Sequence, residues 1–152
     1  IQINSIKDAI MRLGLKNLQG WVSVLALAGI DVKPHELLML AVVRAKSLEL
    51  WAEKGRKANK ETYFMVGLFS CLDALMDKSM PEILDDMSIA NEAKEALLYQ
   101  TGDIGQALLC MMAIEQGRDA DVHFLELSTE EIISSYLSAI SWASNALSIM
   151  EK

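Results

Sequence analysis

Apolar residues recur at spacings of three and four along most of this chain, and this helical period is the feature that most constrains its fold. The clearest case begins at Pro34, which suits a first helical position because its missing N–H has no intrahelical partner there, and ends at Gly55. The apolar positions of this segment are Leu37, Leu38, Ala41, Val42, Ala45, Leu48 and Ala52. No run with the period of a strand extends beyond a few residues, so we predict an all-α fold.

Capping residues and glycines divide the rest of the chain into further helices. Two helices are predicted before Pro34, one from Asn4 or Ser5 to Leu13 and one from about 18 to 28. After Gly55 a helix is predicted to begin at Glu61 or Thr62 and to carry Phe64, Leu68, Leu72 and Leu75. Further helices are predicted over 82–87, 91–100 and 104–116, and from Ser128 or Thr129 to about 150. The mixed stretch 118–127 is predicted to be a loop. Because 152 residues is the size of one domain, we expect a single compact bundle of seven or eight helices.

Composition excludes several classes of protein. A hydrophobic fraction of 52% with 23% charged residues excludes a disordered chain. Twenty-one acidic against 14 basic residues, a net charge of -7, argue against nucleic-acid binding, which needs a positive field. No apolar run approaches the roughly 20 residues that span a bilayer, so no membrane insertion is expected. Cys71 and Cys110 lie in apolar stretches, which predicts buried thiols and a reducing, cytoplasmic location.

Few residues of this chain are candidates for catalysis or for binding a metal or an anion. The two histidines, His35 and His123, lack the partners of a zinc-binding helix. The segment 102–105 could present backbone N–H groups to an anion, but Asp103 would repel it, so a plain helix cap with a close helix approach is favoured. Nine methionines could form an adaptable groove, although their apolar neighbours favour core filling.

A basic run over 54–60 stands out in this acidic chain. Its cations, Lys54, Arg56, Lys57 and Lys60, could bind a phosphate, a nucleotide or an acidic partner surface. They would also interact favourably with the negative end of the preceding helix, and both interpretations stay open here.

Several motifs, in order and spacing, make the chain similar to one family. They are Ser5-Ile6-Lys7-Asp8-Ala9-Ile10-Met11-Arg12-Leu13-Gly14, Arg44-Ala45 with Glu49, the segment 64–76, Met80-Pro81-Glu82-Ile83-Leu84, Gly102-Asp103-Ile104-Gly105 with Leu108, and Tyr136 with Ala139 and Trp142-Ala143. Together they resemble the HDOD domain, a modified relative of the HD and HD-GYP phosphohydrolases, in the version found at the C-terminus of bacterial EAL–HDOD signalling proteins. The likeness covers nearly the whole chain, 1–152, which begins with Ile1 and is expected to be an excised piece that lacks preceding helices.

The resemblance implies an HD scaffold without its metal site. In active HD enzymes the helix corresponding to 67–73 reads roughly Gly-Leu-Leu-His-Asp-Ile-Gly, and its His-Asp pair binds the catalytic metal. Ser70 and Cys71 stand in place of that pair, and Arg44 lies where the first metal-binding histidine is expected. A hydroxyl, a neutral thiol and a guanidinium cannot hold a hard cation that activates water. The resemblance thus implies neither a metal nor another cofactor.

The leading interpretation is therefore a non-catalytic regulatory or output domain linked to cyclic-di-GMP signalling. Its expected partners are an attached EAL-like domain, another signalling protein or a second copy in a homodimer. An enzymatic alternative is a residual phosphohydrolase that uses Asp73, Asp77 and His123. A third possibility is a small-ligand sensor with an apolar cavity among Met65, Cys71 and Met111.

Arg44 and Glu49 are expected to link neighbouring helices, and Gly67 is expected to allow two helices to approach closely.

Overall fold

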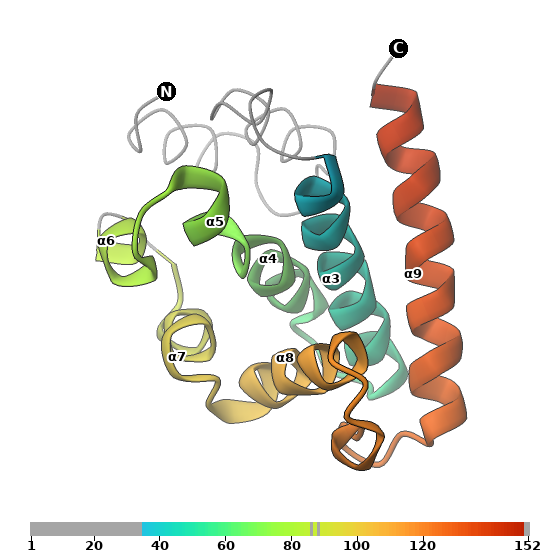
Figure 1. Cartoon of the computed structure of the whole chain (residues 1–152). Helices are drawn as coiled ribbons and strands as arrows, with labels where there is room; N and C mark the ends of the chain where they lie inside the picture. The colour runs from blue at the N-terminus through green and yellow to red at the C-terminus, as the bar shows by residue number, and fades with distance from the viewer. Residues whose placement is uncertain (1–34, 86, 88, 151–152) are drawn as a thin grey trace.

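The long helix predicted after Pro34 is the structural centre of the domain. The computed structural model describes residues 35–85, 87 and 89–150, and the two helices predicted within 1–34 lie outside these residues. Helix α3 (His35–Lys54) packs against α4 (Lys60–Phe69), α8 (Gly102–Glu115) and the last helix, α9 (Thr129–Met150). Figure 1 shows α4 and α9 on opposite sides of α3.

Shorter helices complete the bundle. They are α5 (Leu72–Met76), α6 (Met80–Asp85), α7 (Asn91–Tyr99) and the 3-10 helix η2 (Asp119–Asp121), which interrupts the predicted loop over 118–127. The described residues contain no strand, so the predicted all-α bundle is confirmed. None of the helices in the described part combines the length and apolar character needed to span a bilayer.

One predicted helix is divided in two. The sequence predicts a continuous helix through Phe64, Leu68, Leu72 and Leu75, but α4 ends at Phe69 and α5 begins at Leu72. The Ser70 hydroxyl donates a hydrogen bond to the Gly67 carbonyl at 2.7 Å, a local bond that competes with helix continuation. Because the apolar side chains on both sides of the break are buried, their spacing does not reveal it.

Gly67 allows α3 and α4 to approach very closely, as predicted. A Cβ atom at this position would lie 2.7 Å from the Cα and backbone N of Ala45 and from the carbonyl carbon of Arg44. Side-chain Cβ atoms essentially never come so near to backbone atoms, so only glycine fits here without a shift of one helix. This contact sets the position of the α4–α5 break relative to α3.

Aromatic residues occupy the helix junctions. Trp51 is fully buried and donates a hydrogen bond from Nε1 to the carbonyl of Ile132 in α9 at 3.0 Å. Its ring neighbours Phe124, which follows η2 and which the sequence reading did not identify as core. Trp142 of α9 makes an edge-to-face contact with Phe64, and the Lys46 ammonium lies 4.5 Å from its ring centre. Trp51 and Trp142 therefore both lie at helix junctions.

Two further expectations about the interior are confirmed. Both cysteine thiols are free and buried. Met65 and Met111 are buried, and Met39, Met76 and Met112 pack against the core, so these methionines fill space between helices.

The start of α9 is fixed by a reciprocal pair of hydrogen bonds. The Glu131 amide donates to the Ser128 hydroxyl at 3.1 Å, and the Ser128 amide donates to the Glu131 carboxylate at 3.0 Å. These bonds lower the pKa of Glu131. Ser128 is thus the capping residue and Thr129 the first helical residue, which decides between the two predicted starts.

Candidate functional site

The residues that the HDOD resemblance aligns with a metal site come together in space. Arg44 extends from α3 towards the α4–α5 break, where its Nη1 lies 3.0 Å from Ser70 Oγ and 3.6 Å from Cys71 Sγ. Three positions from two separate parts of the chain therefore converge on one point. The fourth member of this group is Glu115, the last residue of α8, which the sequence reading did not identify.

Arg44 and Glu115 form a two-pronged ion pair. Arg44 Nε donates to Glu115 Oε2 at 2.8 Å, and Nη2 donates to Oε1 at 2.7 Å. The two side chains are only 12% and 18% exposed, so water screens the pair weakly. Burial by itself would lower the pKa of Arg44, but the hydrogen bonds and charge of Glu115 outweigh it and raise that pKa above its ordinary value. The guanidinium is a permanent positive charge at the centre of the cluster.

The remaining groups in the cluster are neutral. Burial raises the pKa of the Cys71 thiol, and the nearby charge of Arg44 offsets only part of this increase, so the thiol remains protonated at neutral pH. Within the described residues, no three His, Cys, Asp or Glu side chains are grouped as metal ligands. The cluster is arranged to hold α3, α8 and the α4–α5 break together.

Glu49 does not take part in this linkage. Its carboxylate pairs at 2.7 Å with Lys46, three residues earlier in the same helix. The expectation that Arg44 links neighbouring helices is confirmed, whereas the same expectation for Glu49 is wrong. The reason is local, since the Glu49 carboxylate accepts from a lysine one turn away on its own helix.

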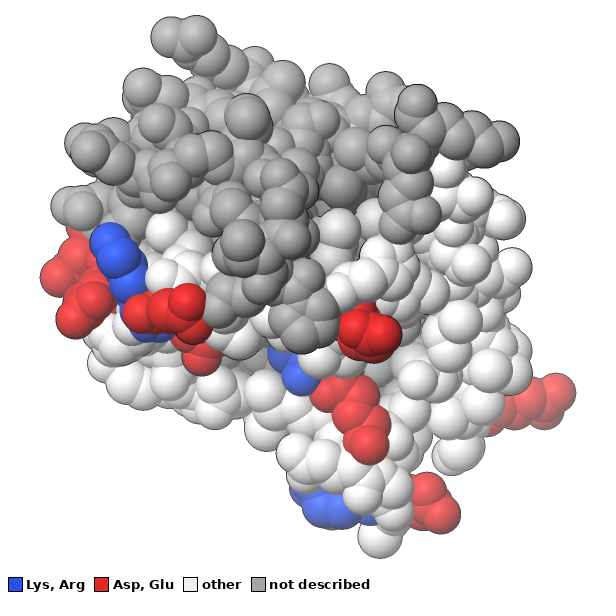
Figure 2. Space-filling model, turned by 45° about the horizontal axis from the view of Figure 1, so that its top comes forward, with Lys and Arg blue, Asp and Glu red and all other residues white. Residues whose placement is uncertain are grey.

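The basic run is divided between paired and unpaired cations. Lys57 pairs with Asp103 at 2.6 Å, and Lys60 lies 3.9 Å from Glu53. Lys54 and Arg56 are exposed and form no salt bridge within the described residues. Together with Lys57 they border an open hollow of about 490 Å³, whose other wall includes Leu125 and Glu131. On the face drawn in Figure 2, basic and acidic side chains are interspersed and form no continuous basic surface.

The structure shows where the residues of the two alternative functions lie. Asp73 is in α5 and Asp77 follows it, but His123 follows η2, and the three do not form a ligand group. Met65, Cys71 and Met111 are buried in the core, and none of them lines the hollow beside the basic run, the hollow at the start of α8 or the hollow between α6 and α7.

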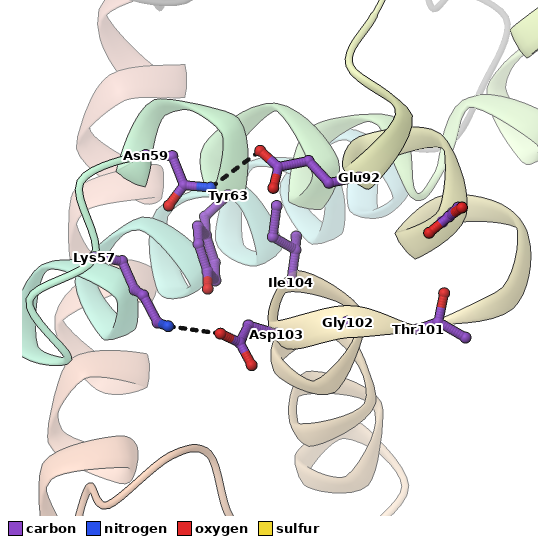
Figure 3. A pocket seen from close by; sticks show the side chains of 9 residues that line it. Lys57, Asn59, Tyr63, Glu92, Thr101, Gly102, Asp103 and Ile104 are labelled. Carbon is purple, nitrogen blue, oxygen red and sulfur yellow. Dashed lines mark hydrogen bonds and ion pairs between the residues drawn. The ribbon is translucent and has the colours of Figure 1, made fainter.

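A second polar site lies where α4, α7 and the start of α8 meet. Figure 3 shows this hollow of about 280 Å³, which is bordered by Lys57, Asn59, Tyr63, Glu92 and Asp103, among others. Asn59 donates to Glu92 at 3.2 Å, and the phenol of Tyr63 points towards the Lys57–Asp103 pair. Sequence reasoning missed Tyr63 and Glu92 because they are 29 positions apart and belong to no motif. The close approach predicted for the segment 102–105 is confirmed, since a Cβ on Gly105 would collide with the Gln100 backbone, but the N-cap residue Thr101 forms no side-chain capping bond.

Comparison with known proteins finds two curated relatives. The chain is 30% identical over 152 residues to YuxH of Bacillus subtilis, an uncharacterized protein, and the match covers 96% of this chain and 37% of the relative. It is 31% identical over 149 residues to CdgJ of Vibrio cholerae, a cyclic di-GMP phosphodiesterase, with 94% and 34% covered. The chain thus spans about a third of the length of these relatives. No protein-family model and no solved structure matches the chain.

Proposed function

We propose that this chain is a non-catalytic regulatory domain of the HDOD type, which acts by contacts with an attached EAL-like domain in a cyclic-di-GMP signalling protein. The relative from Vibrio cholerae is named for hydrolysis of cyclic di-GMP, and this chain matches about a third of it. In the proposal, catalysis belongs to another part of such a protein. This domain transmits the state of a partner through its helices.

The observation that carries the proposal is the guanidinium of Arg44 beside Ser70 and Cys71. These are the positions that the resemblance assigns to metal ligands, and Arg44 Nη1 lies within 3.6 Å of both Ser70 Oγ and Cys71 Sγ. A permanent cation held there by Glu115 repels a divalent metal ion. A neutral thiol and a hydroxyl offer it no charged ligand.

The non-catalytic part is tested with metal and substrate. We expect no heat of binding when Mn²⁺ or Mg²⁺ is titrated into the full chain, and no metal-dependent turnover of cyclic di-GMP or nucleotide phosphates. Circular dichroism on the same samples establishes that the chain is folded. Saturable binding of one ion per chain, abolished by Cys71→Ala or Asp73→Asn, would contradict the proposal and favour hydrolysis.

The regulatory part is tested by charge reversal at the exposed cations. In the full-length protein that contains this chain, Lys54→Glu with Arg56→Glu should change the rate of cyclic-di-GMP hydrolysis by more than about fivefold, the size of a 1 kcal/mol interface contribution. The control is Lys78→Glu with Lys94→Glu, which alters the net charge equally at another surface. Equal rates in both variants and the wild type would remove the basic run from the proposed interface.

A further inference from the structure

We propose that the polar hollow between α4, α7 and the start of α8 binds an organic cation with several N–H donors, of the guanidinium or primary-amine class. This inference is independent of the proposed regulatory function, because it depends on a different set of side chains. The hollow of about 280 Å³ is near the lower end of ligand-site volumes, so it suits a small ligand or a single side chain.

The first argument is the position of the Tyr63 hydroxyl. Tyr63 is only 1% exposed, and its ring is held by an edge-on contact with Phe124, whose ring centre is 6.1 Å away. Its hydroxyl reaches the hollow but forms no hydrogen bond with any described residue. This hydroxyl is not one of the fully enclosed side-chain atoms without a partner, which among the described residues are Ser47 Oγ and Ser135 Oγ. It is reached from the hollow and is therefore available to a ligand that enters there.

The second argument is the charge of the walls. Glu92, Glu95 and Asp103 contribute three carboxylates, against the single ammonium of Lys57. Burial, followed by the negative charges of Asp103 and Glu92, raises the pKa of Tyr63 to about 12, which indicates a negative field at its hydroxyl. This negative field would repel an anion at the start of α8, whereas it would attract a cation.

The third argument concerns the type of cation. The acceptors in the walls come from different helices, and a guanidinium or ammonium group carries several donors that can reach more than one of them. Within the described residues, no set of three or more acidic, thiol or imidazole groups forms a metal site, which disfavours an inorganic ion. The Lys57–Asp103 pair is partly exposed, at 30% and 57%, so an entering cation can replace Lys57 at little cost.

The test uses calorimetry on the full chain with two guanidinium probes. Agmatine represents a free small molecule, and N-acetyl-arginine amide represents a side chain carried by a protein. We expect saturable binding of at least one probe at low salt, and tighter binding of one than of the other identifies the source. Sodium sulfate is the anionic comparison, and we expect no binding of it.

Three variants locate the site. Tyr63→Phe should weaken binding at least about tenfold, because it removes a hydrogen bond to a charged group. It should leave the melting temperature unchanged, since the hydroxyl has no partner among the described residues of the free chain. Glu92→Gln should weaken binding similarly. Lys57→Met should strengthen it about two- to fivefold, since it releases Asp103.

Matched controls and contrary results complete the test. Tyr99→Phe and Asp119→Asn make the same chemical changes at exposed positions outside the hollow and should leave affinity unaltered. The inference is overturned if neither probe binds, if Tyr63→Phe binds as tightly as the wild type, or if sulfate binds and Lys57→Met abolishes that binding.

Discussion

Replacing Gly67 by alanine is expected to lower the free energy of unfolding by about 3 kcal/mol, the upper range for overpacking a close-packed interior. The added Cβ would lie 2.7 Å from backbone atoms of α3, which cannot move aside as the end of a flexible side chain can. Helices α3 and α4 must therefore separate. Urea denaturation followed by circular dichroism measures the loss.

Gly117→Ala provides a control with the same chemical change. No atom lies within 4 Å of a Cβ at this position, but the backbone has a φ of +70°. Only conformational strain opposes the substitution, which should cost about 1 kcal/mol. If Gly67→Ala costs no more than Gly117→Ala, the close approach of α3 and α4 is not a determinant of stability.

Arg44→Met is expected to cost about 3 kcal/mol, within the range for breaking a buried ion pair by removing one partner. The loss arises because the Glu115 carboxylate, only 18% exposed, is left without its two hydrogen bonds. Adding Glu115→Met to this variant removes the stranded charge. The double variant should therefore be more stable than Arg44→Met alone.

A double-mutant cycle by urea denaturation measures this coupling. The comparison pair is Arg118 and Asp121, which have the same chemistry and a contact of 2.7 Å but are 45% and 59% exposed. Its coupling should be below about 1 kcal/mol. Additive effects of the two substitutions at Arg44 and Glu115 would show that the pair contributes no net stability.

Local rules of the sequence predict much of the fold. Apolar spacing and Gly55 predict α3 to within one residue, and the cap before Asp103 predicts the start of α8 to within two. The α4–α5 break escapes prediction because the apolar spacing continues across it, and the hydroxyl-to-carbonyl bond of Ser70 at the break leaves no mark on that spacing. Phe124 escapes it because an aromatic residue in a loop of mixed character belongs to no helical period.

The candidate sites are predicted less completely, because they combine distant segments. The resemblance to the HDOD domain assigns Arg44, Ser70 and Cys71 to one site. Glu115 is 71 positions from Arg44 and belongs to no motif of the sequence. Tyr63 has helical apolar neighbours and resembles any core residue in the sequence. Only the fold shows that its hydroxyl reaches a negatively charged hollow.

The central position of α3 has a mechanical consequence. Along this one helix, Arg44 is anchored to the end of α8, Lys46 lies over an aromatic ring of α9, and Trp51 is bonded to the first turns of α9. We therefore expect that a displacement of α9 shifts α3 and, through the Arg44–Glu115 ion pair, the end of α8. A partner that binds α9 would thus alter the position of α8 without touching it.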